Sequence, residues 1–454
     1  MSNLIVVILA AGQGTRMKSR LPKVLHPLAG KPLLSHVIDT ARCLKPEKIM
    51  VVYGHGGEQV PSALAGDDLT WVEQAEQLGT GHAVEQAIGE IDNDSSLLVL
   101  YGDVPLIQTT TLAELVRLGS EGFSLLTVHL LNPTGYGRIV RNSHGEVLRI
   151  VEEKDASEAE RSITEINSGI MCTSAKQMRD WLSQLENNNA QKEYYLTDTI
   201  GMAVEAGISV KTTHPVAQQE VAGVNSRSQL AELERYYQLQ LAEKLMASGV
   251  TIIDPARLDI RGDVQIAADV LIDINVVLQG KVRIDAGASI GPNCVIVDSA
   301  IGEDAELLSN CVIESSSVGA GCQLGPFSHL RPGTVLSENV KVGNFVEIKN
   351  STIGSGSKVN HLSYVGDTSM GSGVNIGAGT ITANYDGANK HRTVIGDNAS
   401  TGANSVMVAP VTIEKGATIG AGSVITKTAP EDQLTLTRAK QVTVEGWQRP
   451  TKKK

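Results

Sequence analysis

The first half of the chain alternates short runs of aliphatic residues with stretches in which apolar residues recur at helical spacing. The runs Leu4–Ala10, Lys48–Tyr53, Leu97–Tyr101 and Phe123–Leu130 predict buried β-strands. The helical spacing is clearest between the first two runs, in Leu33, Val37, Ile38 and Ala41. Strands that alternate with helices predict a mainly parallel sheet covered on both faces, and such sheets bind ligands at the carboxyl ends of their strands.

The pattern changes near residue 226. Ser226 and Gln229 have the spacing of a capping box, which marks the start of a helix. One apolar face follows at helical spacing, formed by Leu230, Leu233, Tyr237, Leu241 and Leu245. We therefore predict a first domain over 1–227, a connecting helix over 228–248 and a second domain over 249–454.

Beyond that helix an aliphatic residue recurs every five or six positions, usually followed by Gly and then by a small residue four places after the aliphatic one. Examples are Ile290–Val295, Val318–Cys322, Ile376–Thr380 and Ile419–Ser423. This period is the hexapeptide signature of a parallel β-helix, because inward aliphatic residues stack from coil to coil while Gly, Asn and Asp form the tight corners. A flexible Gly-rich linker would lack the periodic aliphatic residues.

The repeat is interrupted once, between Thr380 and Val394. An insertion in a coil of this kind maps to a loop that projects from one face, and that face is often the binding face. We therefore expect this segment to project from the coil and to wall a pocket.

Composition narrows the classes of function. A chain of 454 residues exceeds one ordinary core, and 3% aromatic residues with 45 glycines suit a domain built of small turns. The net charge of −11 argues against a nucleic-acid-binding surface, and no apolar run approaches the roughly 20 residues that span a bilayer. We expect neither nucleic acid nor a membrane as a partner, and the basic end Lys452–Lys454 is predicted to be a solvated tail.

The five cysteines are scattered without metal-binding spacing, which is typical of reduced thiols in a cytosolic protein. The start of the chain has no cationic segment before its short apolar run, so that run reads as a buried strand and not as a signal peptide. Both observations predict a cytoplasmic location.

A glycine-rich turn follows the first predicted strand, with Gly12 and Gly14 ahead of Arg16 and Lys23. Glycines at a strand-to-helix turn let backbone N–H groups approach phosphate oxygens, assisted by the helix N-terminus, and the two cations can neutralise a triphosphate. A dinucleotide-binding fingerprint would need a third Gly where Met17 stands. The Gly-Lys-Ser/Thr of an ATPase phosphate loop is also missing from the string.

The whole string resembles the signature of sugar-phosphate nucleotidyltransferases, Gly-x-Gly-Thr-Arg followed by Pro-Lys, and further parts of that signature follow in order. By this resemblance, the residues that bind nucleotide and sugar phosphate are Leu9, Ala10, Ala11, Gly12, Arg16, Lys23, Gln74, Gly79, Thr80, Tyr101, Gly102, Asp103, Gly137, Glu152, Asn167 and Asn225. Taken one at a time, several of these residues could equally be turn residues or solvated surface residues. Their occurrence together and in order favours a site.

The chemistry of these residues fits uridylyl transfer. The Gln74 amide offers a donor and an acceptor to the O4 and N3–H edge of uracil. Asp103 follows a strand and can bind Mg²⁺, and the resemblance makes Asn225 the second protein ligand. The resemblance implies in-line attack of a sugar-1-phosphate oxygen on the α-phosphorus of UTP, with catalysis expected from positioning and charge neutralisation.

A second group of residues departs from the small and aliphatic pattern of the repeats: Arg331, Lys349, His361, Tyr364 and Asn375. Two cations near a histidine suit a phosphorylated amine, with Arg331 and Lys349 on the phosphate and His361 removing a proton from the attacking amine. A histidine in a corner can equally be a hydrogen-bonded turn residue. The projecting loop just downstream favours a site, and because no cysteine follows Cys322, direct transfer from a thioester donor is the simpler route.

Both halves, the connecting helix and several motifs resemble the family of bacterial bifunctional UDP-N-acetylglucosamine pyrophosphorylase/glucosamine-1-phosphate N-acetyltransferases. The motifs are Phe345-Val-Glu, Asn-His-Leu-Ser-Tyr, Asn-Tyr-Asp-Gly-Ala-Asn-Lys and the closing Glu445-Gly-Trp-Gln-Arg-Pro. The resemblance implies an α/β Rossmann-like nucleotidyltransferase domain followed by a left-handed parallel β-helix of hexapeptide repeats, and a homotrimer. It implies Mg²⁺ at the N-terminal site, and UTP, acetyl-CoA, glucosamine-1-phosphate and N-acetylglucosamine-1-phosphate as substrates.

The resemblance also implies an acetyl-CoA site, at Ala378, Asn384, Tyr385, Ala403, Ala421 and Arg438. Ala403 and Ala383 depart from the Ser and Cys that are common in the family, which bears on details of donor contact. Two rival hypotheses stay open: a monofunctional nucleotidyltransferase whose β-helix assembles or regulates the enzyme, and a non-catalytic scaffold with the same two folds. On the bifunctional hypothesis the acetyl transfer comes first, because its product is the substrate of uridylyl transfer.

Overall fold

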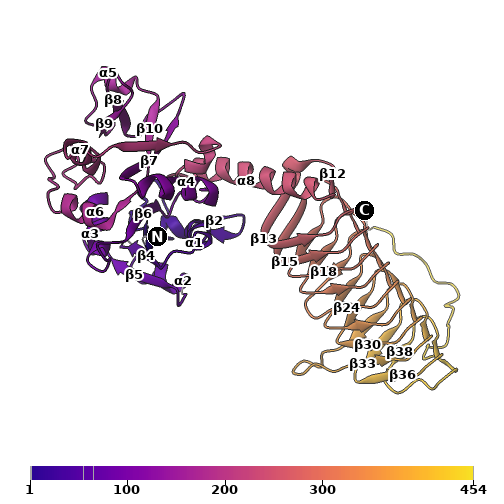
Figure 1. Cartoon of the computed structure of the whole chain (residues 1–454). Helices are drawn as coiled ribbons and strands as arrows, with labels where there is room; N and C mark the ends of the chain where they lie inside the picture. Colours follow the sequence, from indigo (N-terminus) through magenta and orange to yellow (C-terminus); the bar gives the residue numbers. More distant parts are fainter. Residues whose placement is uncertain (1–2, 55, 65, 453–454) are drawn as a thin grey trace. The chain divides into compact units, whose positions relative to one another are not determined.

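The computed structural model of the protein describes residues 3–54, 56–64 and 66–452, so Lys453 and Lys454 of the predicted tail lie outside the described residues. Contacts between residues divide the chain into two compact units, Met1–Tyr237 and Gln238–Lys454 (Figure 1). No helix among the described residues is long and apolar enough to cross a membrane.

The first unit is built on a sheet with the strand order β11-β7-β10-β6-β1-β4-β5. Its strands are β1 (Leu4–Leu9), β4 (Lys48–Tyr53), β5 (Leu69–Glu73), β6 (Ser96–Tyr101), β7 (Phe123–His129), β10 (Glu165–Ser174) and β11 (Val210–Thr213). The four predicted strands are confirmed to within one residue at each end. The sheet is mainly parallel, but β10 runs antiparallel to both β6 and β7.

Helices cover both faces of this sheet because neighbouring strand residues point to opposite sides. On one side Val7 and Leu9 pack in a core with Val84 of α3 (Thr80–Ile88), and helices α6 (Ala175–Leu182) and α7 (Asp198–Glu205) complete this face. On the other side Val6 and Ile8 pack with residues of α1 (Leu33–Cys43) and α4 (Thr109–Gly119). The predicted two-sided cover is therefore confirmed.

Shorter elements complete the first unit. They are η1 (Thr15–Met17), η2 (Lys23–Leu25), β2 (Pro27–Leu28), β3 (Lys31–Pro32), α2 (Gln59–Ala63), β8 (Arg138–Arg141), β9 (Val147–Val151), α5 (Glu158–Arg161) and η3 (Gln218–Val221). The hairpin β8–β9 extends from β10, since Arg138 pairs with both Ile166 and Val151.

Helix α8 (Arg227–Ala247) follows the first unit's last loop. Its start differs from a standard capping box. The backbone N–H of Gln229 donates to Ser226 Oγ over 3.2 Å, but the Gln229 side chain accepts from the backbone N–H of Asn225 over 2.9 Å, one residue earlier than predicted. Ser226 begins the helix as expected, and Gln229 instead orients the residue before it.

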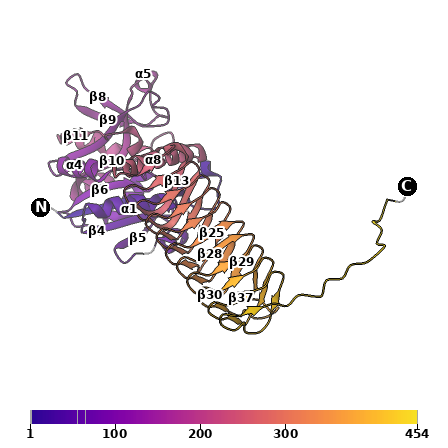
Figure 2. The same cartoon turned by 90° about the vertical axis from the view of Figure 1, so that its right-hand side faces the viewer.

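The second unit is a left-handed parallel β-helix, whose coils are stacked in the ladder that Figures 1 and 2 show. One of its sheets has 11 strands: β12 (Thr251–Ile252), β14 (Leu271–Ile272), β16 (Ser289–Ile290), β19 (Glu306–Leu307), β22 (Gln323–Leu324), β25 (Lys341–Asn344), β28 (Lys358–His361), β31 (Asn375–Ile376), β34 (Ser400–Thr401), β37 (Thr418–Ile419) and β39 (Leu434–Thr435). A short η4 (Pro255–Arg257) connects the first coil.

The other faces form a sheet of 17 strands. They are β13 (Leu258–Ile266), β15 (Val276–Ile284), β17 (Val295–Val297), β18 (Ala300–Ile301), β20 (Val312–Glu314), β21 (Ser317–Val318), β23 (His329–Leu330), β24 (Val335–Leu336), β26 (Glu347–Lys349), β27 (Thr352–Ile353), β29 (Tyr364–Gly366), β30 (Thr368–Met370), β32 (Ile381–Ala383), β33 (Thr393–Ile395), β35 (Val406–Val408), β36 (Val411–Ile413) and β38 (Val424–Ile425).

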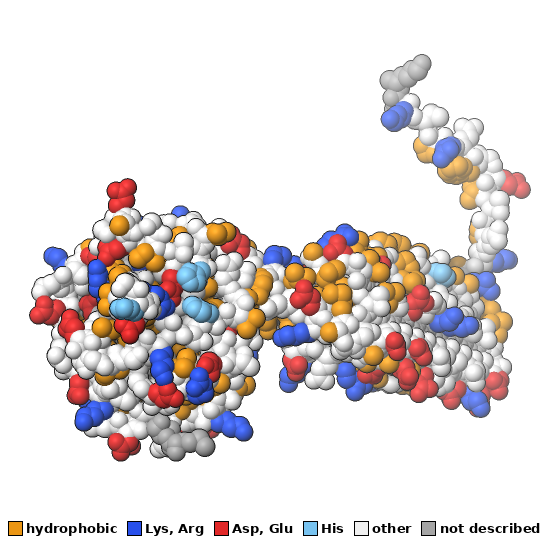
Figure 3. Space-filling view, turned by 45° about the horizontal axis from the view of Figure 1, so that its top comes forward, with side chains coloured by type: hydrophobic (Ala, Val, Ile, Leu, Met, Phe, Trp, Pro, Cys, Tyr) orange, Lys and Arg blue, Asp and Glu red, His pale blue; other side chains and the backbone are white. Residues whose placement is uncertain are grey.

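Stacking of aliphatic residues produces the core of the coil. Ile290, Leu307, Leu324 and Val342 are in register on successive strands, and each is almost fully buried. No coil can bury its own aliphatic face, so each depends on its neighbours. On the outer face that Figure 3 shows, apolar side chains are densest along one edge of the coil, and most charged side chains lie away from that edge.

The interruption of the repeats is shorter than the sequence indicated. Ile381–Ala383 still forms strand β32 of the coil, and strand β33 begins at Thr393. The projecting loop is therefore 384–392, closed at its base by a bond from the His391 N–H to the Asn384 carbonyl. The prediction began the loop too early because Ile381 follows the repeat without the usual Gly.

Candidate active sites

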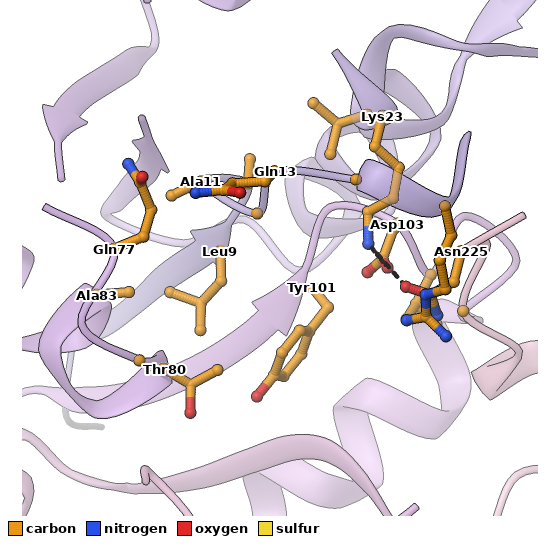
Figure 4. A pocket seen from close by; sticks show the side chains of 18 of the residues that line it. Leu9, Ala11, Gln13, Lys23, Gln77, Thr80, Ala83, Tyr101, Asp103 and Asn225 are labelled. Carbon is orange, nitrogen blue, oxygen red and sulfur yellow. Dashed lines mark hydrogen bonds and ion pairs between the residues drawn. The ribbon is translucent and has the colours of Figure 1, made fainter. Parts of the chain in front are cut away.

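The first unit contains a cavity of about 720 Å³ at the carboxyl ends of β1 and β6 (Figure 4). Twelve of the predicted residues line it: Leu9, Ala10, Ala11, Gly12, Arg16, Lys23, Gln74, Gly79, Thr80, Tyr101, Asp103 and Asn225. The other four lie around it. Gly102 packs against Leu34, Ala10 and Val24, Gly137 lies beside Glu152, and Asn167 is buried on β10.

The segment after the glycine turn differs from its prediction. The chain continues into the short η1 and η2 and not into an α-helix, and the first α-helix begins at Leu33. The turn η1 ends where Lys18 takes a left-handed φ of 48°. Pro22, Pro27 and Pro32 then keep the following stretch from continuing as an α-helix, because proline lacks the N–H that a helix interior needs. The expected contribution of a helix N-terminus to phosphate binding is therefore wrong, and only the backbone of the turn remains for that role.

The two glycines of the turn are needed for different reasons. Gly14 has a φ of 61°, and a Cβ atom there would lie 2.7 Å from Cβ of Lys23. Gly12 has no atom within 4 Å of the position where its Cβ would stand, although it lines the cavity. The fold requires Gly14, whereas at Gly12 the missing side chain leaves space open in the cavity.

Lys23, Asp103 and Asn225 form one polar group. The Lys23 ammonium pairs with Asp103 Oδ2 and donates to Asn225 Oδ1 over 3.1 Å (Figure 4). The Val224 N–H donates to the Asp103 carbonyl over 2.9 Å, which ties the two segments together. A carboxylate and an amide oxygen thus converge on a single cation, and this oxygen-only donor set is the kind that Mg²⁺ prefers.

Gln74 lines the cavity and is almost fully buried. Its Nε2 donates to the Gly79 carbonyl over 3.1 Å and lies 3.0 Å from His82 Nδ1. These contacts fix the orientation of the Gln74 amide, and its side-chain oxygen can accept a hydrogen bond from a ligand.

Tyr101 lines the cavity, and Glu152 lies close enough to it to act on its phenol. Burial raises the pKa of Glu152, against a hydrogen bond of 3.0 Å from Thr197 that lowers it, and Asp198, Asp155 and Glu193 raise it further. Burial also raises the pKa of the Tyr101 phenol, with Glu152 and Asp103 adding to the effect. Glu152 is thus a carboxyl group that ionises less readily than usual.

The second unit brings most of the predicted acetyl-transfer residues to adjoining coils. Asn344 is in register with His361, and Lys349 is in register with Gly366, so Lys349 and His361 lie on neighbouring faces of successive coils, as expected. The His361 Nδ1 lies 3.2 Å from Asn344 Oδ1, and the ring is exposed. Asn375 is in register with Lys358 on the His361 face.

Lys349 belongs to a group of three cations, together with Lys390 and Arg331. The neighbouring Lys390 and, after it, Arg331 lower the pKa of Lys349. Arg331 is itself oriented by Glu347, with its Nη1 atom 2.8 Å from the carboxylate Oε1. Lys390, which belongs to the projecting loop, was missed by sequence reasoning, and its position inside the predicted loop was the available signal.

The proposed donor residues also come together. Ala378, Ala403 and Ala421 occupy equivalent corners of three successive coils, since the Asn404 N–H donates to the Ala378 carbonyl and the Gly422 N–H to that of Ala403. Arg438 lies near Gly420, beside this row. Asn384 Nδ2 lies 3.4 Å from the Tyr364 hydroxyl, whereas Tyr385 is exposed on the loop.

Comparison with known proteins agrees with this two-part arrangement. Residues 6–168 match the MobA-like NTP transferase domain, 392–427 match the bacterial transferase hexapeptide (six repeats), and 260–346 match the GMPPB C-terminal domain. The relatives named bifunctional protein GlmU include those of Cupriavidus pinatubonensis, 56% identical over 99% of both chains, and Marinobacter nauticus, 55% identical over 100% of both. A third, from Nitrosospira multiformis, is 54% identical over 100% of this chain and 99% of its own.

The chain belongs to the bifunctional GlmU family. Membership confirms the family that the sequence resembles, in which a UDP-N-acetylglucosamine pyrophosphorylase is joined to a glucosamine-1-phosphate N-acetyltransferase. The protein is therefore a bifunctional transferase, and the monofunctional and scaffold hypotheses are disfavoured.

Proposed function

We propose that residues 1–227 carry the uridylyl transfer and residues 249–454 carry the acetyl transfer, with acetyl transfer first. The observation that carries this assignment is the presence of two different polar groups in two compact units. One is a glycine turn with a convergent Lys23, Asp103 and Asn225, and the other is a cation group beside an exposed histidine.

In the first site the substrates are held by charge and by backbone donors. The turn at Gly12 and the side chains of Arg16 and Lys23 face the phosphates of UTP. The oxygen of Gln74 accepts from the N3–H of uracil, because its amide nitrogen is already bonded to Gly79. Glu152, in its ionised form, accepts hydrogen bonds from sugar hydroxyls.

Asp103 and Asn225 are the residues that would hold Mg²⁺ in this site, in place of the Lys23 ammonium. A bound Mg²⁺ supplies charge neutralisation at the phosphates. Lys23 then remains to contact a phosphate oxygen. The sugar-phosphate oxygen attacks the α-phosphorus, the bond to the β-phosphate oxygen breaks, and pyrophosphate leaves.

In the second site His361 acts as the base. Its Nδ1 faces the side-chain amide oxygen Oδ1 of Asn344, which favours the tautomer with the proton on Nδ1 and a free lone pair on Nε2. Nε2 takes a proton from the amine as the nitrogen attacks the thioester carbon of acetyl-CoA. The carbon–sulfur bond then breaks, and the CoA thiolate recovers that proton from the histidine.

Arg331, Lys349 and Lys390 bind the phosphate of glucosamine-1-phosphate. Three cations in one place lower the pKa of Lys349, and a phosphate dianion between them removes this repulsion. The alanine row at Ala378, Ala403 and Ala421 leaves room for the donor, with Arg438 beside it. Tyr364 and Asn375 complete the substrate side.

We further propose a homotrimer that works in the cytoplasm, where UTP and acetyl-CoA are available. An exposed apolar ridge supports assembly. Phe327, Phe345 and Leu362 are 50%, 57% and 65% exposed, and all three have positive φ at corners where other coils have Asn or Gly. Large apolar side chains are costly in this conformation, so a partner surface that covers them explains their presence.

A reaction course on the wild-type enzyme tests the assignment. With glucosamine-1-phosphate, UTP and Mg²⁺ alone, we expect no pyrophosphate above background. Addition of acetyl-CoA should release CoA first and pyrophosphate after a lag, and N-acetylglucosamine-1-phosphate should remove the lag. Pyrophosphate release without acetyl-CoA would overturn the order, and the absence of CoA release would overturn the second activity.

A further inference from the structure

Asp367 is a buried carboxylate that no step above uses. The residue is bonded to Lys349 and Asn384 of the second site and is 8% exposed. Its Oδ1 accepts from the amide of Asn350 and its Oδ2 from the amide of Asn384, which is also 8% exposed. One carboxylate therefore joins two amide donors from different coils.

The backbone of Asp367 connects the same two regions. Its N–H donates to the Lys349 carbonyl over 3.0 Å, and its carbonyl accepts from the Thr393 N–H over 3.2 Å. Thr393 lies just past the end of the projecting loop, and Asn384 begins it. Asp367 thus ties the coil that carries Lys349 to both ends of the loop that carries Lys390.

The charge of Asp367 is placed to support the phosphate cations. The carboxylate raises the pKa of Lys349, opposing the larger effect of Lys390 and Arg331. Held by Asp367, Asn384 lies 3.4 Å from the Tyr364 hydroxyl, so the same bond also orients a side chain of the candidate donor site.

The corner itself does not require an aspartate. Asp367 has a φ of 48°, and Asn350, which stands at the equivalent corner of the preceding coil, has a φ of 46°. Asparagine therefore fits this corner without strain. What asparagine cannot do is accept at both of its side-chain polar atoms, as Asp367 does with Oδ1 and Oδ2, since its amide nitrogen is a donor.

We propose that Asp367 is a positioning residue for acetyl transfer, which holds Asn384 and the loop 384–392 so that Lys390 reaches the phosphate site. This inference rests on the proposed acetyl transfer. Displacement of a binding group by about 1 Å costs up to about 100-fold in rate, so Asp367→Asn should lower kcat/KM for glucosamine-1-phosphate by about 10- to 100-fold.

Two further variants separate positioning from folding. In Asp367→Asn combined with Asn350→Asp, residue 350 supplies the carboxylate, accepts from the amide of residue 367 and leaves the oxygen of residue 367 for Asn384. This double variant should recover most of the lost kcat/KM. Asn350→Asp alone sets two carboxylates against each other and should be impaired.

The measurements are KM and kcat for both substrates of acetyl transfer in the full-length enzyme, with pyrophosphate release and the thermal midpoint as controls. We expect the main effect of Asp367→Asn in KM for glucosamine-1-phosphate, and unchanged uridylyl transfer. Unchanged acetyl-transfer kinetics in Asp367→Asn would overturn the proposal, as would a loss that the double variant fails to restore. Wild-type enzyme without CoA release would instead refute the proposed function itself.

Discussion

Replacement of Gly12 and of Gly14 with alanine separates what the ligand requires from what the fold requires. A Cβ at residue 12 meets no atom within 4 Å, so Gly12→Ala introduces no clash. A glycine replaced without strain raises stability by about 0.4–1 kcal/mol, because the unfolded chain loses freedom. The added methyl group stands in the cavity and keeps the backbone from a phosphate oxygen.

The expected loss in binding derives from one hydrogen bond. A hydrogen bond to a charged group contributes about 1.5–3 kcal/mol, so KM for UTP should rise roughly 10- to 150-fold in Gly12→Ala. Gly14→Ala should behave differently. Its φ of 61° costs an alanine about 1–2 kcal/mol, and the contact of 2.7 Å with Lys23 adds strain.

The assay measures pyrophosphate release against UTP concentration at saturating N-acetylglucosamine-1-phosphate, with thermal unfolding in parallel. Gly14→Ala should lower the midpoint of the first unit by roughly 2–8 °C, at about 2–4 °C per kcal/mol for a unit of this size. Gly12→Ala should keep or raise it. A wild-type KM for UTP in Gly12→Ala would refute the reasoning, because the open space at that residue would then serve no ligand.

Three further predictions concern single side chains. Burial raises the pKa of Glu152, and uridylyl transfer requires its ionised form, so the rate should fall on the acidic side at a pH above the ordinary carboxyl pKa of 4.5. The pH profile of Glu152→Gln should lack this acidic limb, and the variant should lose much of its affinity for the sugar phosphate. Lys349→Met should raise KM for glucosamine-1-phosphate by about 10-fold or more and leave KM for acetyl-CoA near the wild-type value in steady-state assays. Gln238→Leu should destabilise the β-helix by about 2–5 kcal/mol in denaturant unfolding, because Gln238 bonds both the N–H (2.8 Å) and the carbonyl (2.7 Å) of Ile260. An unchanged unfolding midpoint in this variant would contradict the role.

Local sequence patterns were sufficient to predict the elements whose structure depends on nearby residues. The strands and the hexapeptide coil can be predicted from alternation and period, which a sequence displays directly. The glycine turn was misjudged in part, because its glycines indicated a helix directly after them. Instead η1 ends before the left-handed Lys18, and Pro22, Pro27 and Pro32 keep an α-helix from forming in the stretch that follows. The prolines stood in the sequence and could have corrected the prediction.

The missed residues of the second site depend on register. Asp367 and Asn350 are 17 residues apart, and Lys349 meets Lys390 across a loop whose path no periodicity describes. Coils here advance by 17 or 18 residues, so the sequence alone leaves it open which side chains face one another. The cation group and its buried carboxylate became visible only once the coils were stacked.

Reciprocal loss of the two activities tests the central claim most directly. Pyrophosphate release and CoA release should be measured on the same preparations of Asp103→Asn and His361→Ala, each checked for wild-type thermal unfolding. Asp103→Asn should lose pyrophosphate release by about 100-fold or more and keep CoA release, and His361→Ala should do the reverse. Loss of both activities in either folded variant, or full CoA release in His361→Ala, would contradict the assignment of two independent sites.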